Sequence, residues 1–277
     1  MAFFKKRQKP APDAETETVV VDDAAAQPVD DAPAAAHAPI PAPTAAPGES
    51  VTPAPDAAAS APHPAAESRG PQALSTDELF AAVRVRLLPA SSSAELGLAY
   101  ARQVAPDLVA VLCVDYPDHI EYLTNEIVAA NDATALFNAG YRSIMAEKFD
   151  VADEFSPGIW ALVGDSHFTA SKAMGLGQLI GSVLPAAPNG VLFAVPHRHM
   201  IFAHMVNAEN TVQAVTTISG LAAQYAAEEN VGGPISDSTY FYNDGVIDLV
   251  SYRTADGGVQ VLGSSRFGEK LGALLGG

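Results

Sequence analysis

Three of the seven histidines of this chain lie in the segment GVLFAVPHRHMIFAHMV, residues 190–206. His197 and His199 form an H-x-H pair, and residues two apart on a regular strand point to the same face. A zinc site needs three or four ligands, so further ligands would have to come from elsewhere in the fold, for example Asp165 or His167. The pair is therefore a candidate for metal binding or for catalysis.

The same segment also contains the signals of a hairpin turn. The apolar runs FAV and MIF flank Pro196, which cannot donate to a sheet ladder, and the chain has to turn between them. His197, Arg198 and His199 are the polar residues available for that corner. We therefore expect these three residues to form the turn, and we expect no metal and no cofactor there.

A second candidate lies in VGDSHFTAS, residues 163–171, between an expected strand and an expected helix. The G-x-S-x-G pattern of a hydrolase nucleophile is broken by Phe168. Asp165, Ser166 and His167 are adjacent, and adjacent residues cannot form a triad among themselves because each group must reach the next across space. We therefore expect Asp165 or Ser166 to cap the following helix.

Two function classes remain open, and neither has an assigned catalytic residue. The first is a non-enzymatic domain that binds a protein partner or a small ligand, with Asp165, His167, His197, Arg198 and His199 as candidate binding residues. The alternative is a hydrolase or metal-dependent enzyme that uses the same aspartate and three histidines. That alternative requires these side chains to converge within about 3–4 Å of a common point.

Hydrophobic periodicity and turn residues predict the elements that position these candidates. Helices are expected to begin with the capping boxes Ser75–Glu78 and Ser92–Glu95. Further helices are expected over residues 131–148, 168–184 and 208–229. Strands are expected over residues 107–115, 119–124, 158–164, 190–196, 199–206, 238–242, 246–252 and 259–263. The turn NDG, residues 243–245, is typical of a three-residue hairpin loop with a bulge.

The order of these elements predicts an α+β fold in which helices pack on a mixed, largely antiparallel sheet. The domain is expected to span residues 75–277, with a helical subregion at 75–106 and a sheet-containing core at 107–277. Residues 1–74 differ, because 13 of the 21 prolines fall within residues 10–74. Frequent proline with few large apolar groups predicts a disordered, acidic, Ala/Pro-rich tail, serving as a spacer or a tether for a partner.

Charge and composition exclude several classes. The net charge is −17, and acidic residues outnumber basic ones both in residues 1–74 (10 to 5) and in the remainder (22 to 10), so nucleic-acid binding is not expected. No apolar run reaches the roughly 18–20 residues of a membrane-spanning helix, and the basic start lacks an apolar signal region. The single cysteine, Cys113, is expected to be a core residue rather than a nucleophile. These features together favour a cytoplasmic protein.

Residues 135–262 resemble the YtpQ-like family of conserved bacterial proteins. The resemblance is carried by ALFN (135–138), HFTAS (167–171), GVLFAVPHRHMIFAH (190–204) and YFYNDGVIDLV (240–250). It implies a fold and a cytoplasmic location and names no activity, since the family is a domain of unknown function.

Overall fold

The structure, a computed structural model, describes residues 70–277 except residues 118, 229–231, 255, 264–265 and 277. Residues 1–69, most of the expected tail, thus lie outside the described residues. The strands of the described part form two sheets, and every pair of neighbouring strands is antiparallel. The smaller sheet has the order β1-β3-β2, with β4 also paired to β3. Its strands are β1 (Val83–Pro89), β2 (Arg102–Ala105), β3 (Leu108–Asp115) and β4 (Ile120–Tyr122).

The larger sheet has the order β11-β10-β9-β7-β8-β6-β5. Its strands are β5 (Val151–Ser156), β6 (Ile159–Val163), β7 (Val191–Ala194), β8 (Met200–Met205), β9 (Thr239–Asn243), β10 (Val246–Arg253) and β11 (Val259–Val261). The helices are η1 (Pro71–Ala73), α1 (Thr76–Ala82), α2 (Ala90–Glu95), α3 (Asn125–Ala129), α4 (Ala133–Ala146), η2 (Ala170–Gly175), α5 (Leu176–Leu179), α6 (Thr211–Ala226) and α7 (Arg266–Leu275). The predicted α+β class is confirmed. Among the described residues, no helix is long and apolar enough to cross a membrane.

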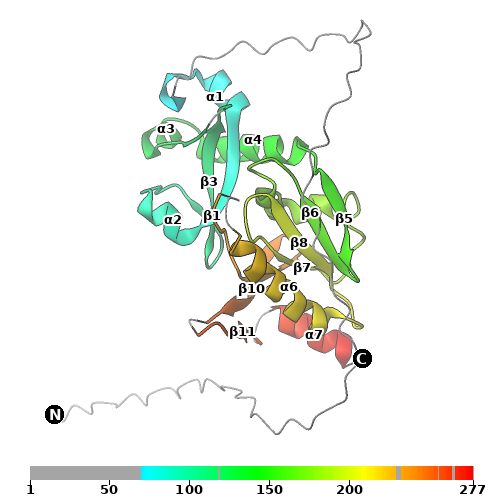
Figure 1. Cartoon of the computed structure of the whole chain (residues 1–277). Coiled ribbons are helices and arrows are strands. Elements are labelled where there is room, and N and C mark those ends of the chain that lie inside the picture. Colours follow the sequence, from blue (N-terminus) through cyan, green and yellow to red (C-terminus); the bar gives the residue numbers. More distant parts are fainter. Residues whose placement is uncertain (1–69, 118, 229–231, 255, 264–265, 277) are drawn as a thin grey trace, which may run out of the picture. The chain divides into compact units, whose positions relative to one another are not determined.

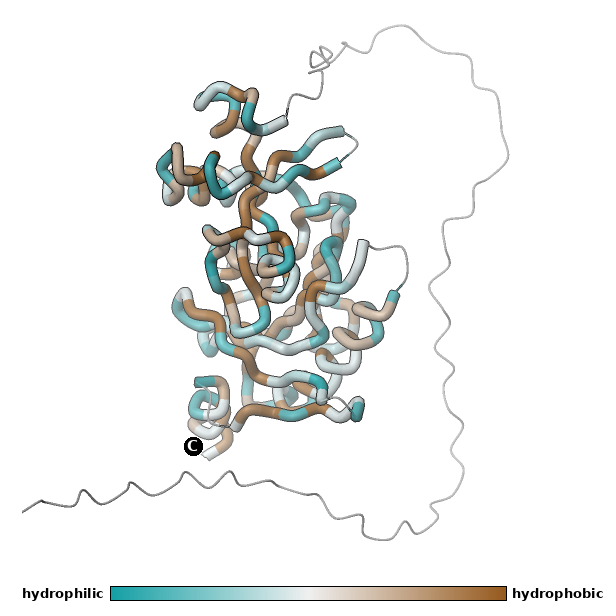
Figure 2. The backbone as a smooth tube through the Cα atoms, turned by 90° about the vertical axis from the view of Figure 1, so that its left-hand side faces the viewer, coloured by the Kyte–Doolittle hydropathy of each residue, from teal (hydrophilic) through white to brown (hydrophobic). Residues whose placement is uncertain are grey.

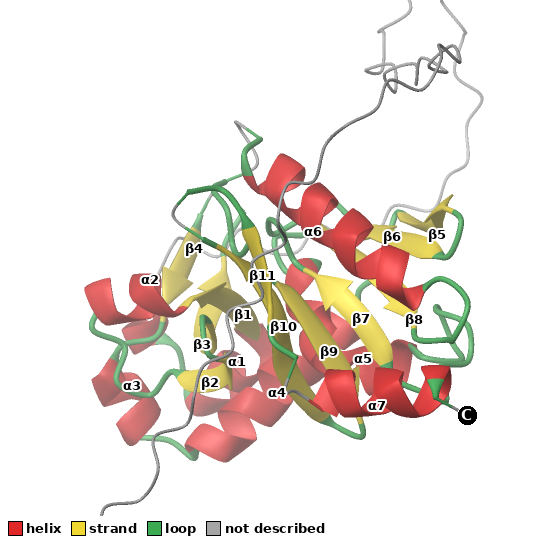
Figure 3. Ribbon diagram, turned by 90° about the horizontal axis from the view of Figure 1, so that it is seen from below, coloured by secondary structure: helices red, strands yellow, loops and turns green. Residues whose placement is uncertain are grey.

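Side chains alternate between the two faces of the larger sheet, as a pleated strand requires. On β7, Leu192 and Ala194 face α6 and α7, which cover one side of the sheet (Figure 3). Val191 and Phe193 face the opposite side, where they pack with η2, α5 and residues of the smaller sheet. Figure 2 shows hydrophobic and hydrophilic stretches following one another along the described backbone.

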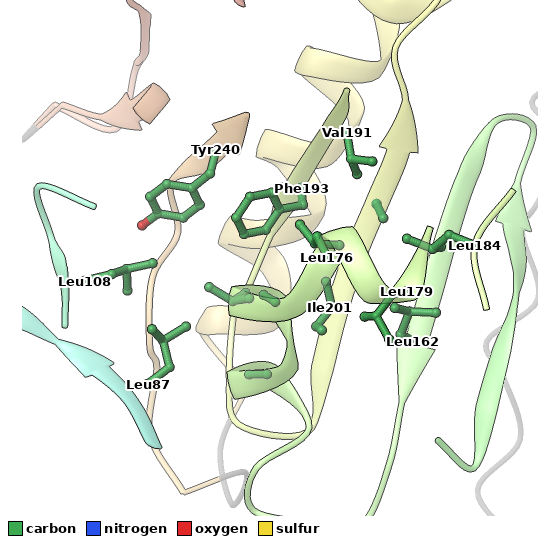
Figure 4. Packing of buried hydrophobic residues seen from close by; sticks show 14 of the residues in the cluster. Leu87, Leu108, Leu162, Leu176, Leu179, Leu184, Val191, Phe193, Ile201 and Tyr240 are labelled. Carbon is green, nitrogen blue, oxygen red and sulfur yellow. The ribbon is translucent and has the colours of Figure 1, made fainter. Parts of the chain in front are cut away.

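The two sheets share one hydrophobic cluster. Leu87 of β1 and Leu108 of β3 lie beside Phe193 and Tyr240 of the larger sheet (Figure 4). A polar contact crosses the same boundary, because the carboxylate of Asp107 accepts hydrogen bonds from the Tyr240 hydroxyl at 2.7 Å and from Ser236 at 2.9 Å. Burial, and then the nearby carboxylate, raises the pKa of Tyr240. The sheets are therefore joined by both apolar and hydrogen-bonded contacts.

The predicted helical subregion at 75–106 is wrong, because β1 and β2 lie within it. In VRVRLL the apolar residues satisfy a strand period as well as a helix period. The segment forms a strand rather than a helix because all seven residues of β1 pair with β3, from Val83 opposite Val114 to Pro89 opposite Leu108. The second expected capping box is also absent, since α2 begins at Ala90 and has no side-chain cap.

Other elements differ from expectation in detail. The segment 168–184 forms a 3-10 helix and a short α-helix rather than one long helix, and Gly175 and Gly177 lie directly against Tyr141 and Tyr242. The β9–β10 loop has two residues, because Asn243 pairs with Val246. Asp244 and Gly245 both have positive φ, at 49° and 82°, so the turn is type I′ rather than a bulged three-residue loop.

The first capping box is confirmed. Ser75 accepts a hydrogen bond from the Glu78 backbone N–H, and Glu78 accepts one in return from the Ser75 backbone N–H. We expect Ser75→Ala to lower the free energy of unfolding by about 1 kcal/mol, because the first turn of α1 loses both its side-chain acceptor and the reciprocal geometry. Urea denaturation checks this, and Ser91→Ala, on an exposed residue of α2, should change the value by less than about 0.5 kcal/mol.

Candidate functional site

The histidine segment forms a turn, as the sequence predicts. β7 ends at Ala194, β8 begins at Met200, and His197, Arg198 and His199 lie between them. The loop after β6 holds this turn from the side. The Gly164 N–H donates to the His199 carbonyl at 3.1 Å, and the Ala170 N–H donates to the Arg198 carbonyl at 2.9 Å. The two candidate segments of the sequence are therefore neighbours in the fold.

Both ring nitrogens of His199 are engaged. Nε2 accepts a hydrogen bond from Nε of Arg198 at 2.8 Å, so in the neutral ring the proton sits on Nδ1. Nδ1 lies 3.0 Å from the Gly164 carbonyl and donates to it. The ring thus links its own turn to the loop after β6 and orients the guanidinium of Arg198. It leaves no lone pair for a metal ion.

His197 is buried and neutral. Its Nδ1 accepts a hydrogen bond from the His199 backbone N–H at 3.3 Å. Burial, and then the neighbouring His199 and Arg198, lowers the pKa of His197 to about 4. Its Nε2 lies 3.9 Å from the Glu228 carboxylate and makes no hydrogen bond to a described residue. Since the ring is uncharged near neutral pH, this contact is not an ion pair there.

The side chains of the 163–171 loop serve local structure. Ser166 donates to the carboxylate of Glu147 and accepts from the Phe168 N–H at 3.1 Å, so its partner is an acid rather than a histidine. Asp165 is exposed, and its backbone N–H donates to Asp150 at 2.7 Å. The N-cap of η2 is Thr169, without a side-chain cap bond, so the expected capping of this helix by Asp165 or Ser166 is wrong.

His167 lies beside the turn without joining the histidines into a metal site. Its ring centroid is 5.8 Å from that of His199, and the centroids of His197 and His199 are 6.2 Å apart. Burial, followed by the charge of Arg198, lowers the pKa of His167. Within the described ranges, no group of three or more His, Cys, Asp or Glu residues could hold a metal ion.

Two other residues singled out by their chemistry are structural. His204 is buried, with Nδ1 2.7 Å from the Gly158 carbonyl and Nε2 2.9 Å from the Thr211 hydroxyl, so it ties β8 to the β5–β6 turn and to α6. Cys113 is fully buried in β3, and burial raises the pKa of its thiol to about 12. The predicted role of Cys113 as a core residue is confirmed.

A pocket of about 430 Å³ opens beside the turn, and Arg198 is one of its lining residues. It is built from segments far apart in the sequence: β1, α2, β4, the turn and the loop at residues 232–235. The residues that give it its character are Arg86, Glu95, Tyr122, Arg198, Gly232 and Ile235. Of the five predicted binding residues, only Arg198 lines this pocket. Asp165, His167, His197 and His199 are not among its lining residues.

Arg86 is the site residue that sequence reasoning missed. It alternates with valine and leucine on β1, and its Nε is buried without a hydrogen bond to any described residue. Its guanidinium carbon lies 5.8 Å from the centroid of the Tyr122 ring, an arrangement that favours a cation. The signal is the R-x-R pattern in an apolar strand, which the expected helical subregion at 75–106 does not take into account.

The guanidinium of Arg198 lies against the backbone of Gly232. A Cβ atom at this glycine, which has φ +81°, would overlap the guanidinium group. Burial, and then the positive charge of Arg86, lowers the pKa of Arg198. The charge of Arg86 therefore acts on the guanidinium of Arg198.

Comparisons with known proteins give no relative for this chain: no family model, no curated protein and no solved structure matches it.

Proposed function

We propose that the protein is a non-enzymatic ligand-binding domain whose site is the pocket between β1, β4, the 197–199 turn and residues 232–235. The observation that carries the proposal is the different position of each polar side chain in the 197–199 turn. His197 is buried and both ring nitrogens of His199 form hydrogen bonds, whereas Arg198 lines an open pocket. A volume of about 430 Å³ lies within the range of small-molecule sites, roughly 300–1,000 Å³.

The alternative, a hydrolase or metal-dependent enzyme, has less support from the geometry. It needs Asp165, His167, His197 and His199 to converge on a reacting centre. Asp165 is exposed, and both nitrogens of His199 are engaged in hydrogen bonds. The proposal also includes membership of the YtpQ-like bacterial family, which the four similar sequence segments support. It includes a cytoplasmic location as well, which the single buried cysteine supports.

The proposal predicts that a pocket-filling variant blocks ligand binding. Ser92 lines the pocket, whereas its neighbour Ser91 is exposed and lies outside the lining. A panel of small organic acids, amides and alcohols is screened by thermal shift and by protein-observed NMR. At about 100 times its Kd, a ligand should stabilise the fold by about 2.7 kcal/mol. NMR shifts should fall on Tyr122 and Ile235.

Ser92→Trp should abolish this stabilisation, and the matched control Ser91→Trp should retain it. The proposal is contradicted when no compound of the panel stabilises the protein, or when binding shifts fall outside the pocket and survive in Ser92→Trp.

A further inference from the structure

We infer, building on the proposed function, that the pocket binds small organic anions, and that Arg86 and Arg198 together hold the oxyanion group of the ligand. The charge pattern supports this. The protein carries a net charge of −17, yet within the described ranges neither arginine forms an ion pair with a carboxylate. Two cations without acidic partners in an acidic protein form a site complementary to an anion.

Arg84 shows what a structural arginine looks like on the same face of the same strand. Its guanidinium donates to the carbonyls of Ala82 and Val83, each at 3.1 Å, and its Nε lies 3.7 Å from the Glu147 carboxylate. Arg86, two residues along, makes no such contacts with described residues and turns to the pocket and the Tyr122 ring. Apart from the Tyr122 ring, the charge of Arg86 has no partner among the described residues.

Contacts within the protein already position the side chain of Arg198. Its Nε–H donates a hydrogen bond to the ring of His199, and Gly232 lies against the guanidinium from the side. This arrangement leaves the terminal nitrogens for a ligand, and a guanidinium offers paired donors that match the oxygens of a carboxylate or phosphate. Burial, and then the charge of Arg86, lowers the pKa of Arg198, and the negative charge of an oxyanion in the pocket counteracts both effects.

The other lining residues of the pocket indicate which groups the ligand carries besides its oxyanion. Leu88, Leu96, Pro234 and Ile235 supply apolar surface, and Tyr122 supplies an aromatic ring. The ligand class is therefore a small carboxylate or phosphate ester with an apolar or aromatic group. Glu95 is the one acidic residue of the described lining, and it is exposed at the rim. It selects against ligands with a second anionic group.

Four probes test separately the need for a negative charge, for a carboxylate or a phosphate, and for an aromatic group. They are benzoate, its neutral counterpart benzamide, phenyl phosphate and inorganic phosphate. Binding to the full chain is measured by titration calorimetry and by NMR at low ionic strength. We expect benzoate or phenyl phosphate to bind at least about 10-fold more tightly than benzamide, because a charged hydrogen-bond acceptor is lost in the amide. The tighter of the two identifies the oxyanion, and inorganic phosphate should bind more weakly than phenyl phosphate.

Variants assign the site. Arg86→Gln should weaken binding about 10- to 100-fold, and Glu95→Gln should strengthen it a few-fold. Arg142→Gln removes the same charge from an exposed position on α4 and should leave binding unchanged. Gly232→Ala should displace the Arg198 guanidinium and weaken binding. Gly181→Ala, at a glycine outside the pocket lining with φ +79° and nothing within 4 Å of its Cβ position, should share the backbone strain and keep the affinity.

The inference is overturned when benzamide binds as tightly as benzoate, or when Arg86→Gln and Arg142→Gln weaken binding equally. It also falls, while the proposed function stands, when a neutral compound binds with shifts at Tyr122, is blocked by Ser92→Trp, and is unaffected by Arg86→Gln. When no probe or panel compound binds in the pocket, both fall together.

Discussion

Acidification from pH 6.5 to pH 4 is expected to lower the free energy of unfolding, and His197 should account for about 3 kcal/mol of the loss. The pKa of His197 falls from 6.5 to about 4 on folding, and each pKa unit corresponds to about 1.4 kcal/mol. Between these two values the unfolded chain binds the proton and the folded protein resists it. Stability therefore rises with pH across this window and is lost as pH falls. The cause is burial first, then the adjacent His199 and Arg198.

The matched variant for this prediction is His197→Asn, because the amide oxygen can still accept the hydrogen bond from the His199 N–H. Urea denaturation at a series of pH values, followed by the fluorescence of the single tryptophan, Trp160, gives the slope. The variant should lose about 3 kcal/mol less than the wild type between pH 6.5 and 4. A residual slope is expected in both proteins, because burial also lowers the pKa values of His167 and His204.

His119→Asn is the control, since it removes an exposed imidazole and should keep the wild-type slope. Equal slopes in the wild type and His197→Asn would show that His197 does not stay neutral on folding. A stability difference between these two that is independent of pH would point to lost packing rather than to a proton.

The sequence predicts this fold well where only one hydrophobic period is present. The sequence predicts the hairpin at 190–206 and the helix α4 correctly. Two short apolar runs separated by a proline and a polar corner favour paired strands, and a 14-residue amphipathic run favours a helix. The prediction failed at residues 83–88, where V-R-V-R-L-L satisfies both periods and pairing with β3 decides. Local sequence contains no information about that partner strand.

Local sequence predicts only the part of the candidate site that lies in the turn and the neighbouring loop. The polar corner His197–His199 follows from the forced turn, and the neighbouring loop with Asp165 and His167 was named as well. The tertiary contacts of Gly164 and Gly232 decide which of these side chains line the pocket. Gly164 binds the His199 ring, and Gly232 lies against the guanidinium of Arg198. Arg86 enters the pocket through the register of β1, and neither spacing nor motif connects it to the turn.

Removal of the Phe193 ring is expected to have the largest effect on stability, because this side chain fills the boundary between the two sheets. Phe193 is 1% exposed, and its ring centroid lies 5.4 Å from that of Tyr240. Phe193→Ala should lower the free energy of unfolding by about 3–5 kcal/mol, which combines lost burial with an unfilled cavity. That is a large share of the roughly 5–15 kcal/mol that stabilises a typical domain.

Phe155→Ala is the matched control, since Phe155 lies on the edge strand β5 with 44% of its surface exposed. Its loss should cost less than about 1 kcal/mol. Both values come from urea denaturation followed by Trp160 fluorescence and by circular dichroism. Because Leu87 and Leu108 of the smaller sheet pack into the same cluster as Phe193, the two signals should report one transition in the wild type and in both variants. Equal losses in the two variants would contradict the placement of Phe193, and separated transitions would show that the sheets unfold independently.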